Sequence, residues 1–587
     1  MSRPLVIYGA FGRRRLERSI KDWSRTVVYE NDARVPDSIR RQAAAVISPE
    51  PTYPGETVAR LNQQLEDLLD AFLDDLAPTP GLETGRVFRS ACMSMEGMRI
   101  VMPWLRALEE ARRVIASGPF SELIISPGCG LCIAAWEQVA LSLGVPVRVL
   151  DLDGPEPPLP WMLRRRIQRW YHMRGRKPPK SRVFKLPEFQ PGDELLCVDG
   201  RVEVILGEAG AAAGWRRAPA FTAGDEKALD TLRASYLDWW KQWWLRWDQA
   251  HAAEGPLSAH HALKRLGEWS AQEVYPRSLL ALQQAREHLK RLKPRRILVG
   301  TMYGKVELMW VVAARELGIE VGAYTLDDAI HPRLCFQPDF LFFDDQRQQV
   351  FATERGIPES RMVPVRTHRL PAAAPRSESV CKRPLVVIAD TSYHGVNASP
   401  SPMISFWALE VVVEAARLLP GWDFAFKFHP IKERPKPLFN YDGCHHPHIY
   451  ERERHFRSLH PPANVRVTAP EERFSDFMGT ADAVLHIYSY AAIEAMAASI
   501  PAVLLATRND DPNVAWRCMR DADVLPVATD AAELVQTLRT LHEDHRHLKQ
   551  VIQAQKRFLK IFHRAEGTTL AEATATRWPS MDSQGRI

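Results

Sequence analysis

The sequence has no apolar stretch long enough to span a bilayer. A membrane-spanning helix needs about 20 consecutive apolar residues, and even the apolar segment after Ile487 is interrupted by Glu494 and Pro501. The first residues, Met1 to Tyr8, run directly into a strand-like segment and lack the apolar core of a signal peptide. We therefore expect a cytoplasmic protein, with any membrane contact limited to the periphery of the inner face.

Repeated C-x-x-C motifs and a strong net charge of either sign are also missing. The 587 residues include only 8 cysteines, and Cys129 and Cys132 form a C-x-x-C pair without a second pair downstream. This pattern fits reduced thiols better than a disulfide framework or a zinc site. Lys and Arg number 77 against 71 Asp and Glu, and a net charge of +6 is modest for this length. We expect no nucleic-acid partner.

Two segments of the chain share one βαβ plan. Residues 122–154 contain an apolar strand, a Gly-rich turn, a helix and a second strand, and residues 296–328 repeat this order. At a constant offset the two segments are identical at several positions, including the pairs Gly130 and Gly304, Trp136 and Trp310, Gly144 and Gly318, and Asp153 and Asp327. We interpret them as equivalent units, consistent with an internal duplication. Each ends in an acidic loop after a strand, the edge where open α/β sheets bind ligands.

The region between these units is basic and rich in tryptophan. A Pro-rich stretch from Pro155 to Arg182 carries a dense cationic cluster, and residues from Leu229 to Leu292 are predicted to be helical, with Trp240, Trp243, Trp244 and Trp247 on one face. Either these indoles pack against a neighbouring domain, or they stack on sugar rings or enter a membrane interface. The candidate acceptor or membrane contacts are Arg164, Arg165, Arg166, Trp243 and Trp244.

The C-terminal half is organised around the stretch from Thr480 to Leu505. Residues 483–487 are predicted to form a buried strand, residues 488–490 a polar turn and Ala491 the start of a helix, with a further strand after Pro501. The turn then lies at the carboxyl end of a strand and the amino end of a helix, a place that attracts phosphate. The alternative is an ordinary βαβ unit with a surface turn.

The length and the restart of parallel-strand patterns define the domains. A chain of 587 residues exceeds what one core supports, and Pro371 to Arg383 has the composition of a linker. We predict an α/β fold of two Rossmann-like parallel-sheet lobes facing a cleft. Residues 1–154 and 293–375 form the N-terminal lobe, residues 155–292 a basic, Trp-rich, largely helical insertion, and residues 383–575 the C-terminal lobe with a helical tail.

This plan resembles that of GT-B glycosyltransferases, most strongly over residues 296–570. Three pieces carry the resemblance in the order seen in bacterial capsule and surface-polysaccharide transferases: Lys427-Phe428-His429-Pro430, Ala481-Asp482-Ala483-Val484, and Tyr488-Ser489-Tyr490-Ala491-Ala492-Ile493-Glu494-Ala495. Within that group the chain looks most like bacterial sialyltransferases and polysialyltransferases, and like Kdo-type capsule transferases. Two motifs depart from the pattern, because Asp327-Asp328-Ala329 has Ala in place of Gly and Ser489-Tyr490 lacks a second hydroxyl.

The resemblance implies a role for each motif. Asp327 or Asp328 would be the base for the acceptor hydroxyl, and His429 would stabilise the departing phosphate. The expected donor-binding residues are Ser392, Lys427, His429, Pro430, Tyr488, Ser489, Tyr490 and Glu494. No metal or other cofactor is expected. The donor would be a CMP-linked nonulosonic acid or Kdo, and the acceptor a surface glycan, a lipid-linked precursor or a protein.

Other interpretations stay open. The aspartates could instead cap the following turn, and His429 could be structural. Asp151-Leu152-Asp153 has the D-x-D pattern with which GT-A transferases hold a divalent metal. A CDP-polyol phosphotransferase has similar His-Pro and Ser-rich motifs. Outside enzymes, the chain could be a non-catalytic GT-B-like module that binds an acidic polymer or a membrane.

Overall fold

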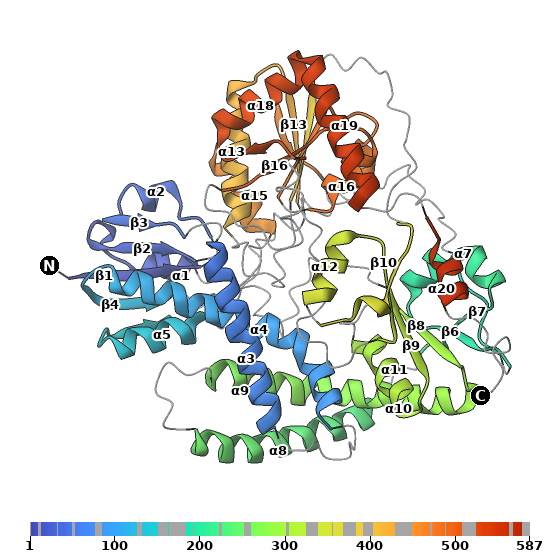
Figure 1. Cartoon of the computed structure of the whole chain (residues 1–587). Coiled ribbons are helices and arrows are strands. Elements are labelled where there is room, and N and C mark those ends of the chain that lie inside the picture. Colours follow the sequence, from blue (N-terminus) through green and yellow to red (C-terminus); the bar gives the residue numbers. More distant parts are fainter. Residues whose placement is uncertain are drawn as a thin grey trace.

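Three parallel β-sheets covered by helices form the framework of the protein (Figure 1). Every strand pair between named strands in the described part of the chain is parallel, which confirms the α/β class. The computed structural model describes residues 2–9, 13–31, 33–49, 53–76, 85–125, 132–150, 163, 184–190, 192–221, 226–251, 260–300, 305–324, 338–354, 356–367, 383–390, 403–428, 449–469, 472–487, 489–507, 524–562 and 567–577.

The first sheet belongs to the N-terminal lobe, which lies within residues 2–150. Its strand order is β3-β2-β1-β4-β5. The strands are β1 (Arg3–Tyr8), β2 (Val27–Glu30), β3 (Ala45–Ile47), β4 (Phe120–Ile125) and β5 (Val147–Val149), and the helices are α1 (Arg13–Ser19), α2 (Asp37–Arg40), α3 (Gly55–Asp75), α4 (Gly85–Ala116) and α5 (Cys132–Ser142). Leu5 and Ile7 contribute to one core and Val6 and Tyr8 to another, so β1 is buried on both faces.

The second sheet forms a middle lobe within residues 184–367. Its order is β11-β10-β9-β8-β6-β7. The strands are β6 (Leu195–Cys197), β7 (Trp215–Arg217), β8 (Arg296–Val299), β9 (Glu320–Tyr324), β10 (Phe340–Phe343) and β11 (Met362–Pro364), accompanied by α7 (Gly200–Ala212), α11 (Lys305–Glu316) and α12 (Gln346–Glu354). The strands of residues 1–154 and of residues 293–375 belong to different sheets, so the expectation that these residues share one lobe is wrong for their strands. Strand β8 pairs with β9 and with β6, which lies in the presumed insertion.

The two βαβ units that look alike in sequence adopt matching structures in different sheets. Leu123 pairs with Val147 in the first, and Ile297 pairs with Val321 at the equivalent positions of the second. Both helices end at a glycine with left-handed backbone, Gly144 (φ 71°) and Gly318 (φ 68°), a conformation that other residues adopt at a cost. The equivalence predicted from sequence therefore extends to strand register and to the helix ends.

A helical layer connects the N-terminal and middle lobes. It consists of α8 (Glu226–Ala250), α9 (His260–Trp269), a π-helical turn (Ser270–Val274) and α10 (Tyr275–Leu292), together with α3 and α4. Helix α4 packs on α5 of the N-terminal lobe and on α11 of the middle lobe. The prediction of helix from Leu229 to Leu292 is confirmed over α8 and over residues 260–292.

The tryptophans of α8 point into this layer. Trp240, Trp243 and Trp244 are only 1%, 5% and 7% exposed. Phe72 of α3 meets Trp243 edge-on with 5.6 Å between ring centroids, and a Cβ on Gly267 would lie 1.9 Å from the Trp240 indole. The expectation that Trp243 and Trp244 contact an acceptor or membrane is therefore corrected, since the neighbouring helices cover these indoles.

The third sheet forms the C-terminal lobe, within residues 383–562. Its order is β14-β13-β12-β15-β16-β17. The strands are β12 (Leu385–Ala389), β13 (Asp423–Lys427), β14 (Val465–Val467), β15 (Ala483–His486), β16 (Ala502–Leu505) and β17 (Val527–Ala528), and the helices are α13 (Ile404–Leu418), α15 (Ile449–Ser458), α16 (Ala491–Ala497), α18 (Ala531–Glu543) and α19 (His545–Phe562). Helices α13 and α16 flank this sheet on opposite sides (Figure 1). The strands predicted before the turn and after Pro501, and the helix start at Ala491, are confirmed.

Helix α20 (Leu570–Arg577) packs on α7 of the middle lobe. There Trp215 Nε1 donates a hydrogen bond to Thr574 Oγ1 at 3.1 Å. The amide of Arg366 donates to the carbonyl of Thr568 at 2.8 Å. Of the predicted helical tail, α20 thus packs on the middle lobe, while α18 and α19 pack on the C-terminal lobe.

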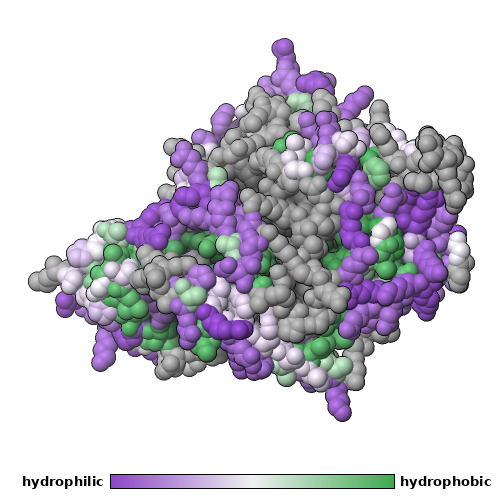
Figure 2. Space-filling view, turned by 60° about the horizontal axis from the view of Figure 1, so that its bottom comes forward, coloured by the Kyte–Doolittle hydropathy of each residue, from purple (hydrophilic) through white to green (hydrophobic). Residues whose placement is uncertain are grey.

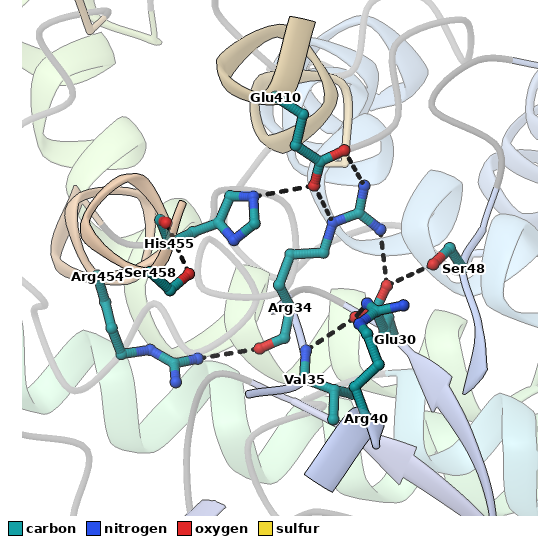
Figure 3. Close-up of polar contacts among 9 residues, drawn as sticks. All are labelled: Glu30, Arg34, Val35, Arg40, Ser48, Glu410, Arg454, His455 and Ser458. Carbon is teal, nitrogen blue, oxygen red and sulfur yellow. Dashed lines mark hydrogen bonds and ion pairs between the residues drawn. The ribbon is translucent and has the colours of Figure 1, made fainter. Parts of the chain in front are cut away.

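A network of charged side chains joins the N-terminal lobe to the C-terminal lobe (Figure 3). Arg34 donates to the buried Glu30 at 2.6 Å and, across the lobe boundary, to both carboxylate oxygens of Glu410 at 3.0 and 3.2 Å. His455 Nε2 lies 2.9 Å from Glu410, and Arg454 donates to the carbonyl of Arg34 at 3.1 Å. The two lobes are thus held together by charge-assisted hydrogen bonds.

Polar and apolar residues alternate over the surface that faces the viewer in Figure 2. Individual leucines such as Leu141 and Leu143 are exposed at 66% and 54%. Scattered apolar residues of this kind are ordinary for a protein surface. Across the described ranges, no helix combines the length and apolar character needed to pass through a bilayer.

Candidate functional site

The candidate site is the carboxyl edge of the C-terminal sheet. Strands β12 and β15 are neighbours at its centre, while the chain leaves β12 towards β13 and leaves β15 towards β16. The strand order therefore reverses between β12 and β15. In open parallel sheets, ligands bind in the crevice outside the carboxyl ends of the strands at such a switch point.

Main-chain hydrogen bonds keep three strand ends level at this edge. The amide of Asp390 donates to the carbonyl of Lys427 at 3.1 Å, and the amide of Ile487 donates to the carbonyl of Ala389 at 3.4 Å. Lys427, a predicted donor-binding residue, therefore lies directly beside Asp390. Its side chain is half-buried, at the end of the strand next to β12.

A buried ion pair supports the end of β12. Arg452 of α15 donates to Asp390 Oδ2, Ser405 Oγ lies 3.4 Å from the same oxygen, and the side chains of Arg452 and Asp390 are both fully buried. The Arg452 guanidinium also stacks over the Phe428 ring at 4.7 Å. Because losing one partner of a buried ion pair costs about 3–5 kcal/mol, this pair fixes the residue from which the loop after β12 departs.

His486 occupies the end of β15 and is fully buried. Burial lowers the pKa of its imidazole to about 3, so the ring is neutral at ordinary pH. A neutral imidazole has one donor and one acceptor nitrogen. His486 is not among the predicted site residues, although a histidine at the end of an apolar strand beside the predicted turn is a visible signal.

The predicted turn and helix carry the remaining described site residues. Ser489 Oγ accepts the amide of Ala491 at 3.4 Å, and the Tyr490 carbonyl accepts the amide of Ile493 at 2.9 Å. Glu494 lies in the first turn of α16, where burial raises the pKa of its carboxyl group. Helix α16 has only 7 residues, so its dipole is weak and side chains must do most of the binding.

The middle lobe has its own polar cluster at the carboxyl edge of its sheet. Tyr324 at the end of β9 and Thr367 after β11 both donate to Asp344 Oδ2 at 2.8 Å, and Gln348 Oε1 accepts the amide of Asp344 at 3.1 Å. Asp344 is fully buried. Asp344 directly follows the apolar strand β10, and sequence patterns alone do not mark it as a site residue.

Several predicted site residues lie outside the described residues. They are Asp327, Asp328, Ser392, His429, Pro430, Tyr488, Arg164, Arg165 and Arg166. Their roles stay predictions. Of the predicted donor residues, the structure brings Lys427, Ser489, Tyr490 and Glu494 to one lobe. Within the described part of the chain, no three His, Cys, Asp or Glu side chains form a group that could hold a metal ion.

Comparisons with known proteins find similarity at the level of structure alone. No protein-family model matches the chain, and no curated protein matches it. Similar solved structures include a putative UDP-N-acetylglucosamine 2-epimerase from Listeria monocytogenes, at 11% identity and a TM-score of 0.40 over 68% of this chain and 100% of that one. The UDP-GlcNAc 2-epimerase of Neisseria meningitidis bound to UDP-GlcNAc has 12% identity and a TM-score of 0.37 over 63% and 99%.

A glycosyltransferase from Rickettsia africae is similar at 10% identity and a TM-score of 0.34, over 51% of this chain and 80% of that one. All three scores are below 0.5. What these proteins bind or catalyse is therefore not carried over to this chain.

Proposed function

We propose that the protein is a GT-B-type glycosyltransferase that uses a nucleotide-activated sugar. The single observation that carries the proposal is that Lys427, Ser489 and Glu494 belong to one lobe. The strand order in the sheet of this lobe reverses between β12 and β15. These residues offer a cation for phosphate, a hydroxyl for the same phosphate and a carboxylate for ribose hydroxyls. Their order along the chain is the one on which the resemblance to surface-polysaccharide transferases rests.

The proposed reaction is displacement at the anomeric carbon of the sugar. Asp327 or Asp328 takes the proton of the acceptor hydroxyl, the acceptor oxygen forms the new bond to the anomeric carbon, and the bond from that carbon to the phosphate oxygen breaks. The nucleotide leaves with the bonding electron pair, and Lys427 and His429 stabilise its charge. This chemistry needs no metal.

The proposed donor is a CMP-activated nonulosonic acid or Kdo, and the proposed acceptor is a surface glycan, a lipid-linked precursor or a protein. This choice rests on the motif resemblance. A lipid-linked acceptor would bring the protein to the inner face of a membrane. We therefore include peripheral membrane contact in the proposal.

The test is calorimetric titration of the full chain with CMP, CDP, UDP and GDP. We expect CMP to bind most tightly, and His429→Ala to weaken that binding while His545→Ala, at an exposed site on α19, leaves it unchanged. Preference for UDP or GDP would overturn the donor assignment and leave the transferase proposal standing. Absence of binding to all four nucleotides would favour the non-catalytic module instead.

A further inference from the structure

One helix of the C-terminal lobe presents a face made only of cationic and uncharged side chains. Helix α19 has the sequence HRHLKQVIQAQKRFLKIF, without an acidic residue. At 100° per residue, its five Lys and Arg side chains fall within a sector of about 100°. We call them the cationic stripe: Arg546, Lys549, Lys556, Arg557 and Lys560, all of which are exposed.

The opposite face of α19 is fixed against the lobe. Val551, Phe558 and Leu559 are buried, and α19 packs on α16, α18 and α12. Gln555 accepts the amide of Ala502 at 3.2 Å and donates to the carbonyls of Ala502 and Val524 at 3.0 and 3.3 Å. These bonds prevent the helix from rotating, so the cationic stripe is held outward.

In the described part of the chain, the stripe forms no ion pairs of the kind that other surface cations form. Elsewhere in the protein, exposed arginines pair with carboxylates, as Arg286 does with Glu316 at 2.7 Å. Among the described residues, no ion pair joins a cation of the stripe to an acidic side chain. Asp544, just before the helix, accepts the amides of Arg546 and His547, each at 2.9 Å, and these bonds lower its pKa. Asp544 therefore caps the helix rather than lying along the stripe.

We propose that the cationic stripe docks the protein on the surface of an anionic phospholipid bilayer. Arg546 and Lys560 are separated by 14 residues, or about 21 Å along the helix, which is too far for one phosphate group. A straight, convex helix face meets a flat array of headgroups with all five cations at once, whereas a single polyanionic strand is usually bound in a groove. Clusters of about four to eight Lys and Arg on an amphipathic helix bind anionic lipid.

The cationic stripe is then the surface that makes the peripheral membrane contact of the proposed function. The inference rests on that part of the proposed function alone. It replaces the tryptophan face of α8, which is buried, as the described membrane-facing element. Docking through the cationic stripe requires neither a particular sugar donor nor catalytic activity.

The experiment is co-sedimentation of the full chain with vesicles of phosphatidylcholine alone and of equal parts phosphatidylcholine and phosphatidylglycerol. We expect binding to the mixed vesicles only, and release as salt shortens the Debye length below about 10 Å. Lys549→Glu combined with Lys556→Glu should lower the partition coefficient more than about tenfold. The matched control, Lys241→Glu with Lys264→Glu on exposed positions of α8 and α9, should bind like the unmodified protein.

Three results would overturn the inference. They are no binding of the unmodified protein to the mixed vesicles, binding of the stripe variant as tight as that of the unmodified protein, and a loss of binding in the control variant as large as in the stripe variant. The last result would mean that net charge alone determines binding. Circular dichroism and CMP titration of the stripe variant show whether it stays folded. Because the vesicles contain no nucleotide or sugar, a negative result here leaves the nucleotide-binding test untouched, and failure of that test leaves this one untouched.

Discussion

Replacement of Arg34 by Met tests how the N-terminal lobe is held to the C-terminal lobe. Arg34 is the shared donor of the network in Figure 3, bonded to Glu30 within its own lobe and to both oxygens of Glu410 across the boundary. Methionine keeps much of the apolar stem but makes none of these bonds. Residues 33–48 and helix α15 should therefore open more often than in the unmodified protein.

The free-energy cost of Arg34→Met depends on the hydrogen bonds that Glu30 and Glu410 retain in the variant. Glu30 is fully buried but still accepts bonds from Arg40, Ser48 and the amide of Val35. Glu410 keeps His455, and its side chain is 35% exposed, so water replaces part of the loss. A lost charge-assisted bond costs about 1.5–3 kcal/mol, and with partial compensation we expect about 2–3 kcal/mol in total. This corresponds to an increase of roughly 30- to 150-fold in local opening.

The assay is hydrogen–deuterium exchange followed by mass spectrometry, because a protein with three lobes has no single two-state unfolding equilibrium. Peptides from residues 33–48 and 449–460 should exchange faster in the Arg34→Met variant, and peptides from the middle-lobe strands should not. Arg246→Met, at an exposed position of α8, is the control. Unchanged exchange in both segments, or an equal increase in the middle lobe, would refute the role assigned to Arg34.

The same network predicts a dependence on pH. Burial alone would raise the pKa of Glu410, but the hydrogen bond from His455 and the charges of Arg34 and His455 outweigh it and hold the pKa below its ordinary value. A carboxylate with a lowered pKa stabilises the fold above its unfolded pKa, about 4.3 for Glu, and that contribution is lost as the pH falls through the folded value. Once exchange is corrected for the intrinsic rate at each pH, the opening of residues 33–48 should therefore increase below about pH 4 in the unmodified protein, and much less so in Glu410→Gln.

Three further substitutions have defined outcomes. Gly267→Ala should lower the local stability of α8 and α9 by about 1–3 kcal/mol in hydrogen–deuterium exchange, because the new methyl group overlaps an indole, whereas Gly421→Ala, with open space around it, should not change exchange there. Arg452→Met should cost about 3–5 kcal/mol, and adding Asp390→Leu should recover part of that loss; a further loss in the double variant would contradict a simple ion pair. Glu494→Gln should stabilise the protein at neutral pH, since burial disfavours the charged carboxylate, yet weaken nucleotide binding in calorimetry.

The parallel strands of the C-terminal lobe could be predicted because burial on both faces leaves a readable pattern. Residues 483–487 are apolar apart from His486 and are followed by the polar turn at residues 488–490, and β15 covers residues 483–486. The division into three sheets could not be predicted. A βαβ unit specifies only its own two strands, and nothing in residues 293–300 shows that β8 will pair with β6 rather than with β4.

The contacts that support the candidate site could not be predicted from the sequence, because the partners lie far apart in the chain and their neighbouring residues suggest a different environment. Arg452 lies among alternating acidic and basic residues of α15, a pattern that is typical of a solvated helix face. In the structure it is fully buried against Asp390, which lies 62 positions earlier in the chain. The face of α8 that carries its tryptophans could be derived from spacing, but whether that face meets solvent or another helix depends on α3 and α9, which the spacing does not specify.

The structure also distinguishes between the two acidic loops that the sequence presents as equivalents. Among the described strands, β5, which precedes Asp151 and Asp153, lies at the edge of its sheet, whereas β9, which precedes Asp327 and Asp328, lies between β8 and β10. The loop after β9 therefore starts beside two other strand ends, including the one that carries the Asp344 cluster. Open parallel sheets bind ligands outside the carboxyl ends of their strands, and among the described strands β9 has such ends on both sides whereas β5 has one on one side only.

We accordingly expect the acceptor base to follow β9. Asp327→Asn with Asp328→Asn should abolish sugar transfer while leaving nucleotide affinity unchanged, because the base acts only on the acceptor hydroxyl. Asp151→Asn with Asp153→Asn should retain transfer and serves as the matched control, with the same change of charge at the equivalent place in the other unit. Loss of transfer in the second variant alone would place the base after β5 and would mean that neighbouring strand ends do not decide which loop is catalytic.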